Sequence, residues 1–376
     1  MTTKAYEMLA QVKDYCLYND TSRDNYILQK MNQVQTTLYN APFKWRALEK
    51  VTDLYTVELL TLNVAPSTPW AVGDTITGAT SETTSTVVSV LSTTTFLIKD
   101  RSDDYTAGEV LSNGTYTADQ GTGYPTVAAS PYLILPADIG VIYDIRQTSD
   151  SPYTKLVYLS PREFHRMVPQ PTQYSENKPT HYTWFEGKLW FIPIPDEGDT
   201  YTLTVYYYRR PTAMKLYSTG TASVSGAAVT GSSTYFSTNA NVDAGMFFAF
   251  TADTLSDGSY AWSEIAAVSS ATGITLKASY AGGTSTGSYI ISSAPTFDED
   301  FVPYIVYQTA FLECGRNREL KETATWLKGM ADEQLRGLVI KQTTVPDHDA
   351  AARGFRMDDR VLGDDAAKYP FIRGNL

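Results

Sequence analysis

Apolar residues recur at helical spacing near both ends of the 376-residue chain. Near the start, spacings of three and four residues predict helices over residues 4–18 and about 23–39, with Ser22 as the N-cap of the second. Near the other end, residues 298–314 are apolar on nearly all faces, which predicts a helix buried on most sides. Residues 317–341 carry an amphipathic stripe instead. We expect these terminal helices to meet in space as one bundle.

Between the helices the period shortens to two, which is typical of strands. Residues 51–62 alternate as one strand, and residues 131–212 form a β region rich in Pro and aromatic residues. In this region Ser160 and Pro161 predict the start of a short helix. Glu186-Gly187 predicts the turn of a hairpin, and the segment TYTLTVYYYRRP at 200–211 shows the clearest alternation of the whole chain.

Two stretches, residues 64–128 and 218–294, have a different composition, dominated by Thr, Ser and Gly with short β-branched runs. Each predicts a small β-barrel or sandwich. A Gly-led strand precedes a shared pattern in both, which indicates a duplication of one module; chance likeness of Ser/Thr hairpins is the alternative. At a constant offset, the pattern Val90, Ser92, Thr94, Phe96, Ile98, Lys99 corresponds to Val268, Ser270, Thr272, Ile274, Leu276, Lys277.

Together these patterns predict an α+β fold: a helical bundle from the N- and C-terminal helices plus a β platform, two inserted small β-barrel or sandwich modules and an extended C-terminal arm. The arm is expected because the last residues lack periodicity and mix their charges. The expected segments are 1–63 (N-terminal helices and first strand of the core), 64–129 (first inserted module), 130–216 (central β platform), 217–296 (second inserted module), 297–342 (C-terminal helices) and 343–376 (arm).

Composition and charge narrow the function. The net charge of −11 argues against a general nucleic-acid binder, since such proteins are basic, but an acidic surface suits a channel through which DNA slides. The 27 Tyr suit subunit interfaces or half-buried strands. Cys16 and Cys314 fall far apart in predicted helices, so no disulfide framework is indicated and a reducing cytoplasm is compatible. We expect no signal peptide and no membrane span.

The residue pattern predicts no catalytic, cofactor-binding or metal site, and we expect the protein not to be an enzyme. The three histidines, His165, His181 and His348, show no metal-ligand spacing. One catalytic pattern stays open, since carboxylates near aromatic residues are also found in glycosidases. The carboxylates Glu186, Asp196, Glu197 and Asp199 lie near Tyr182, Trp184 and Trp190 in sequence, although each is explained first as part of a turn.

The order of these elements resembles that of bacteriophage head-to-tail adaptor proteins. Residues 130–212 resemble the adaptors' central region, with the Pro-capped helix SPREFHRMV and the hairpin and long strand of LWFIPIPDEGDTYTLTVYYYRRPT. The opening helices with Trp45 and the closing helices at 298–341 fit the same plan. The inserted modules are similar to small β-domains of phage structural proteins. The two insertions and the long arm depart from the simplest adaptors.

The resemblance implies a structural virion protein of the neck or tail region, made in the host cytoplasm. It implies a ring of this chain, usually of twelve copies, beneath the portal protein, joining the capsid to the tail and continuing the DNA channel. The helical bundle is expected to form the ring, and the β platform to receive tail or nozzle proteins. The arm at 343–376 is expected to dock on the portal or on a neighbouring copy. Double-stranded DNA passes through transiently, and no membrane is involved.

Two other functions remain open on the sequence. A β-rich tail or baseplate protein could contact host glycans through exposed aromatic residues such as Trp184 and Trp262. An enzyme that degrades cell wall or polysaccharide would need a polar catalytic pair in one pocket. The sequence leaves open the copy number, the host, the face that meets each partner, the role of the two modules and whether the chain is monomeric before assembly.

Overall fold

The computed structural model describes residues 3–18, 21–41, 44–149, 152–170, 175–238, 241–255 and 258–344, with backbone alone at 342–344. The predicted arm at 343–376 therefore lies outside the described residues, apart from the end of the last helix. The chain divides into two compact units. Unit 1 comprises residues 1–48 and 211–376, and unit 2 comprises residues 49–210. Whether the six segments predicted from the sequence fold as separate bodies stays a prediction.

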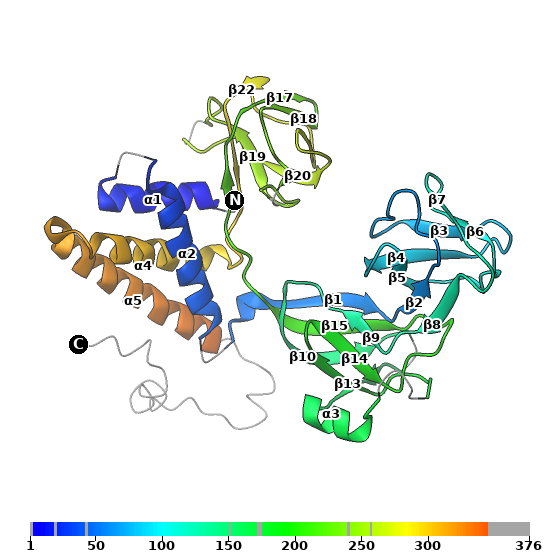
Figure 1. Cartoon of the computed structure of the whole chain (residues 1–376). Coiled ribbons are helices and arrows are strands. Elements are labelled where there is room, and N and C mark those ends of the chain that lie inside the picture. The colour runs from blue at the N-terminus through cyan, green and yellow to red at the C-terminus, as the bar shows by residue number, and fades with distance from the viewer. Residues whose placement is uncertain are drawn as a thin grey trace. The chain divides into compact units, whose positions relative to one another are not determined.

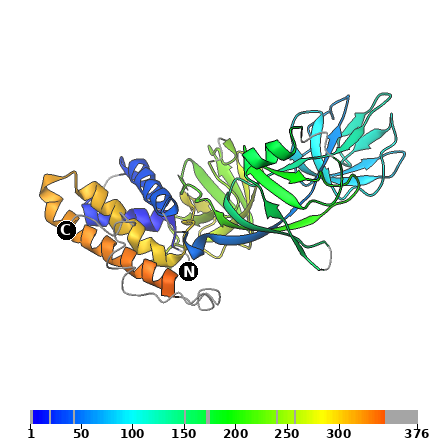
Figure 2. The same ribbon diagram turned by 90° about the horizontal axis from the view of Figure 1, so that it is seen from below.

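Unit 1 holds four helices that pack against one another (Figures 1 and 2): α1 (Ala5–Cys16), α2 (Asp24–Tyr39), α4 (Val302–Cys314) and α5 (Lys321–Thr344). As its apolar faces predict, α4 is central and contacts the other three. Short 3-10 turns lie at Arg46–Leu48, Glu299–Phe301 and Arg318–Leu320. The prediction of Ser22 as the N-cap of α2 is wrong: Arg23 takes that position without a side-chain cap, and Asp24 supplies the negative charge of the first turn.

Unit 2 contains two four-stranded sheets that share a core. The first has the order β1-β15-β10-β11 and the second the order β12-β13-β14-β9. Leu203 and Val205 of the first sheet and Leu189 of the second lie in one buried cluster, which closes the space between the sheets. The strands are β1 (Glu49–Tyr55), β9 (Tyr132–Ile134), β10 (Ile139–Gln147), β11 (Thr154–Lys155), β12 (Val157–Tyr158), β13 (His181–Phe185), β14 (Lys188–Ile192) and β15 (Thr202–Arg209).

Two local predictions in this region are confirmed. Helix α3 (Pro161–Met167) begins after Ser160, whose hydroxyl accepts a hydrogen bond from the Glu163 amide in a capping box. The β13–β14 hairpin turns at Glu186-Gly187, both with positive φ. The single strand predicted over 51–62 is wrong, because the chain leaves one sheet after Tyr55 and enters another at Glu58.

Each Thr/Ser/Gly stretch folds into its own sheet with its own core. The first sheet has the order β7-β6-β3-β4-β5-β2-β8, and the second has the order β16-β23-β19-β20-β21-β18-β17-β22. The first sheet comprises β2 (Glu58–Thr61), β3 (Thr75–Gly78), β4 (Thr84–Val90), β5 (Thr95–Lys99), β6 (Val110–Ser112), β7 (Thr117–Asp119) and β8 (Thr126–Ala129). The second comprises β16 (Leu216–Tyr217), β17 (Thr221–Ser225), β18 (Ala228–Ser232), β19 (Phe247–Phe250), β20 (Ser263–Val268), β21 (Gly273–Leu276), β22 (Thr286–Gly287) and β23 (Tyr289–Ser292).

The strand register shows the structural equivalence of the two modules that the shared sequence pattern indicated, while their origin by duplication stays a prediction. The β4–β5 hairpin has a bulge between Val87 and Ser89, and the β20–β21 hairpin has its bulge between Ile265 and Ala267, the equivalent positions. The turns of both hairpins also have the same pattern of backbone hydrogen bonds. The amides of Leu91 and Ser92 donate to the Thr95 carbonyl, as those of Ser269 and Ser270 donate to the Gly273 carbonyl.

The equivalence extends to the cores of the two modules. The central order β6-β3-β4-β5-β2 corresponds strand for strand to β23-β19-β20-β21-β18. Equivalent positions are buried in both modules, so the two cores share one arrangement and differ in the apolar side chains that fill it. In the first module these are Leu60, Trp70, Ile76, Val87, Phe96, Ile98 and Leu111; in the second they are Val229, Val242, Phe248, Ile265, Ile274, Leu276 and Tyr289.

The predicted fold class, a helical bundle with a β platform, is wrong. The described chain is mostly β-sheet, with four sheets and 33% strand against 24% helix. The terminal helices do pack together, but they are the smaller part. The sequence prediction undercounted the strands because those of the two modules are short and separated by Ser, Thr and Gly turns, which weaken the alternation of any one strand.

Candidate interaction surfaces

An aromatic patch lies where three helices of unit 1 meet. It consists of Tyr15 of α1, Tyr307 of α4 and Trp326 of α5, and we call it the helical aromatic patch. The ring centroids of Tyr15 lie 5.7 Å from Tyr307 and 6.0 Å from Trp326. Trp326 is 51% exposed although it is the largest apolar side chain of α5. Large, partly exposed aromatic side chains of this kind are enriched at protein interfaces.

A second patch covers one face of the β1-β15-β10-β11 sheet in unit 2. It consists of Val51, Tyr143, Tyr206 and Tyr208, and we call it the tyrosine face. Strand β15 alternates cleanly, so its Leu203, Val205 and Tyr207 face the core while Tyr206 and Tyr208 take the opposite face. This alternation is the one predicted from the sequence.

The side chains of the tyrosine face are positioned by contacts between their rings and with Arg146. The Tyr143 ring lies 5.2 Å from Tyr208 and 6.2 Å from Tyr206, and the Arg146 guanidinium lies 5.0 Å over the Tyr206 ring. Desolvation, and then the nearby Glu49 carboxylate, raise the pKa of Tyr143. Strand β1 lies at the end of this sheet, and β15 is its sole strand partner within the described residues. A rigid, half-apolar face beside an open strand edge can accept a partner protein.

In unit 1, helix α1 is fastened to the second module by a small polar and aromatic cluster. The Trp262 indole donates to Glu7 Oε1 at 2.8 Å, and the Lys4 ammonium lies 3.6 Å above the Phe247 ring. The Tyr6 amide donates to the Ser292 hydroxyl. Because Lys4 is only 3% exposed, desolvation lowers its pKa, while the charge of Glu7 opposes this.

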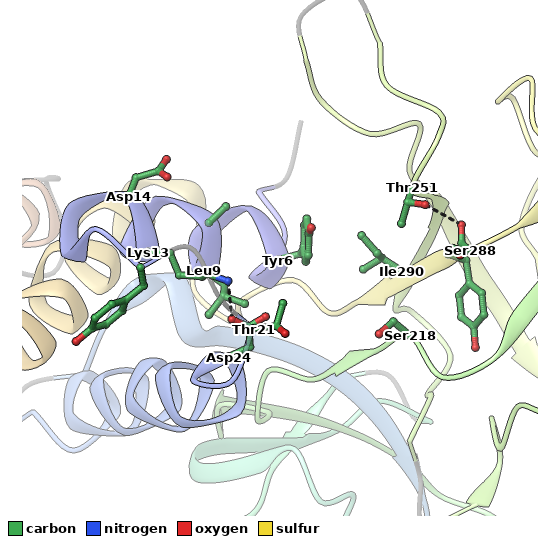
Figure 3. Close-up of a pocket in the computed structure, with 13 residues that line it drawn as sticks. Tyr6, Leu9, Lys13, Asp14, Thr21, Asp24, Ser218, Thr251, Ser288 and Ile290 are labelled. Carbon is green, nitrogen blue, oxygen red and sulfur yellow. Dashed lines mark hydrogen bonds and ion pairs between the residues drawn. The ribbon is translucent and has the colours of Figure 1, made fainter.

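A cavity of about 520 Å³ lies beside this attachment (Figure 3). Tyr6, Leu9 and Lys13 of α1 line one side, and residues of the second module such as Ile290 line the other. The one ion pair in its lining joins Lys13 to Asp24 at 2.8 Å, within unit 1. Two of the three charged residues of the lining thus pair with each other, and the third is Asp14.

In unit 2 a nearly buried arginine joins the first module to the platform. The Arg101 guanidinium, 4% exposed, donates two hydrogen bonds to the Glu58 carboxylate, at 2.9 and 3.0 Å. Glu58 in turn accepts the Gly198 amide at 2.7 Å, and Arg101 also reaches Glu197 at 3.3 Å. Hydrogen bonding to Glu58 raises the pKa of Arg101 despite its burial. These contacts connect the start of β2 and the segment just after β5 to the platform loop at Glu197-Gly198.

The candidate residues from the sequence do not converge on a catalytic pair. Asp196 and Asp199 both accept the Tyr201 hydroxyl, at 2.7 and 3.4 Å, which fits the turn interpretation. Trp184 packs partly buried against the platform core, and the His181 ring nitrogen Nδ1 bonds the neighbouring Thr180 hydroxyl. His348 lies outside the described residues. Both aromatic patches escaped the sequence analysis; for the tyrosine face, the alternation of β15 was an available signal.

Metal binding and membrane insertion find no support in the described residues. Across the residues that the structure describes, no three His, Cys, Asp or Glu side chains gather as a metal site would require. Nor does any described helix combine the length and apolar character needed to cross a bilayer.

A family match covers part of the chain. Residues 107–232, about a third of the chain, match the family model described as SU10 adaptor protein. The match runs from the end of the first module through the platform into the second module, and so it includes most of the tyrosine face. No curated protein matches the chain. Through residues 107–232 the chain is similar to the SU10 adaptor proteins, which supports a phage adaptor role in general and a place in the virion.

Proposed function

We propose that the protein is a head-to-tail adaptor: a non-catalytic structural subunit that forms a ring beneath the portal, joins the capsid to the tail and continues the DNA channel. The observation that carries the proposal is the adaptor-family match over residues 107–232. The element order around this segment and the two exposed aromatic patches add support.

The two patches suggest a division of roles. The helical aromatic patch is built from three helices, so it is a stable surface for contact between neighbouring copies in a ring, which we propose to contain twelve. The tyrosine face lies on the platform, and we propose that it receives a tail or nozzle protein. The residues after α5, at 345–376, are proposed to reach the portal or a neighbouring copy.

The charge of the chain fits passage of DNA without retention. Each copy carries a formal charge of −11, so a ring of copies repels the phosphate backbone rather than binding it. Contact with double-stranded DNA is therefore proposed to be transient and independent of base sequence. The neck or tail region of the virion is the proposed location, after synthesis in the host cytoplasm and without a membrane partner.

The glycan-binding alternative has less support. It requires Trp184 and Trp262 to offer their rings to sugars. Trp262 instead donates to Glu7 and packs against Tyr260 at 5.7 Å, while Trp184 packs on the platform core. Both indoles are thus used within the chain, and no specific observation favours a sugar ligand.

Two charge substitutions test the proposed roles separately. Trp326→Glu is expected to prevent ring formation on the portal, because a carboxylate in a packed aromatic contact is desolvated without a partner. Tyr143→Glu is expected to leave the ring intact but to prevent attachment of the tail protein. Negative-stain imaging of each purified chain, mixed with portal and then with tail protein, gives both results.

The matched control is Tyr235→Glu, the same change at a residue of the second module that is 56% exposed. It is expected to assemble and attach as the unmodified chain does. Circular dichroism confirms that each variant is folded. Normal rings and normal tail attachment by both patch variants would contradict the roles proposed for the patches.

A further inference from the structure

The two cysteines of the chain, far apart in sequence, meet inside unit 1. Cys16 is the last residue of α1, and Cys314 is the last residue of α4. Their sulfur atoms lie 2.9 Å apart, and the residues are 1% and 0% exposed. Non-bonded heavy atoms pack at roughly 3.5–4.0 Å. The two thiols are therefore held closer than ordinary packing, each directed at the other.

Each thiol is also oriented by a backbone carbonyl of the opposite helix. The Cys16 sulfur donates to the Ala310 carbonyl at 3.7 Å, and the Cys314 sulfur donates to the Tyr15 carbonyl at 3.6 Å. These reciprocal contacts fix the register of α1 on α4. A shift of about 1 Å would bring the sulfurs to the bonded distance of about 2.05 Å.

We propose that Cys16 and Cys314 form an oxidative cross-linking site that joins α1 to α4 when the chain folds in an oxidising environment. The co-reactant is a low-molecular-weight disulfide of the glutathione class. One cysteine thiolate displaces a glutathione thiol and forms a mixed disulfide, and the second cysteine then displaces the other glutathione. The chain loses two protons and two electrons, and the small disulfide is reduced to two thiols.

The environment of the two thiols explains why they stay reduced in a reducing compartment. Burial and the nearby Glu313 carboxylate raise the pKa of both thiols, and the adjacent Cys314 raises that of Cys16 further. The thiolate is the reactive form, so reaction in a reducing compartment is slow as well as unfavourable. The bond would close a loop between positions 298 residues apart and would hold α1 on the remaining helices.

The inference does not depend on the adaptor function, and it is tested on the full chain alone. The protein is unfolded, then refolded in a buffer of reduced and oxidised glutathione as oxidising as a secretory compartment. Free thiols are trapped by alkylation, and the intact mass and linked peptides are measured. Neither thiol is expected to be alkylated, and the intact mass should be lower than that of the reduced chain by the mass of two hydrogens. Peptide mapping should show one linked pair that connects Cys16 to Cys314. The denaturant midpoint of unit 1 is expected to rise on oxidation and to fall again with reductant.

Cys16→Ser and Cys314→Ser serve as controls, because each keeps one thiol and cannot form the bond. Their midpoints are expected to be insensitive to the glutathione ratio. Should the unmodified chain keep two free thiols in that buffer, or carry only glutathione adducts or intermolecular links, the cross-linking site would be refuted.

Discussion

At the scale of single residues, Glu109 shows how a charged side chain organises a loop of the first module. The residue is 3% exposed, and its carboxylate accepts hydrogen bonds from the amides of Thr80, Ser81 and Thr106 and from the Ser81 hydroxyl. Burial alone would raise the pKa of Glu109, but these donors outweigh it and hold the pKa below its usual range. The carboxylate thus serves as the hydrogen-bond acceptor for these three backbone amides of the loop.

Glu109→Gln is therefore expected to destabilise the first module by about 1–3 kcal/mol at pH 7, since hydrogen bonds to a charged acceptor are lost. The folded-state pKa is depressed, so this contribution is present above the unfolded pKa of about 4.3 and is lost as the pH falls through the folded pKa. Urea unfolding at pH 7 and at acid pH measures it. The difference between variant and unmodified chain should shrink in acid.

The matched control for this residue is Glu82→Gln, an exposed glutamate of the same loop region. It is expected to change the stability little at either pH. If the urea midpoint of Glu109→Gln at pH 7 equals that of the unmodified chain, the carboxylate does not stabilise the loop.

At the scale of elements, the equivalence of the two modules makes a quantitative prediction. Gly73 and Gly245 occupy equivalent positions before β3 and β19, with φ of 93° and 86°, and a Cβ at either would meet no atom within 4 Å. The cost of alanine is therefore backbone strain alone, about 1–2 kcal/mol at each. We expect equal losses of stability for Gly73→Ala and Gly245→Ala by urea unfolding.

A third glycine gives the opposite expectation and so acts as the control. Gly337 lies in α5 with open space around it, and Gly337→Ala is expected to stabilise that helix by up to about 1 kcal/mol. Clearly unequal costs at Gly73 and Gly245 would contradict the equivalence of the two modules.

The elements also show what the sequence could predict. Long periodic segments such as α1, α2 and β15, and turns with strong local signals such as Glu186-Gly187, follow from nearby residues alone. The break at Thr56–Val57 was missed, because alternation continues from β1 into β2 although the two strands belong to different sheets. Local pattern does not encode which sheet a strand joins.

Surfaces were harder to predict than elements. The helical aromatic patch combines residues 15, 307 and 326, which no local pattern relates, and it appears only when three helices pack. The same holds for the Cys16–Cys314 pair, whose members the sequence placed in separate helices without bringing them together. The balance of helix and strand was misjudged for a different reason, since strands of three to five residues give weak periodic signals.

At the scale of the whole molecule, the described chain has four sheets, a group of four helices in unit 1 and the short helix α3 in unit 2, with an exposed aromatic patch in each unit. The family match covers parts of both modules and the platform, which lies between them in the sequence. This distribution suits a protein whose work is to contact several partners at once, since each unit can present its own surface.

The most direct test of the account is imaging of the purified chain mixed with the portal protein of its own phage. The account predicts a closed ring of this chain on the portal, twelve copies by class averages and by mass. A portal that stays bare at concentrations well above those of the virion assembly reaction, with the chain folded and monomeric in solution, would contradict it.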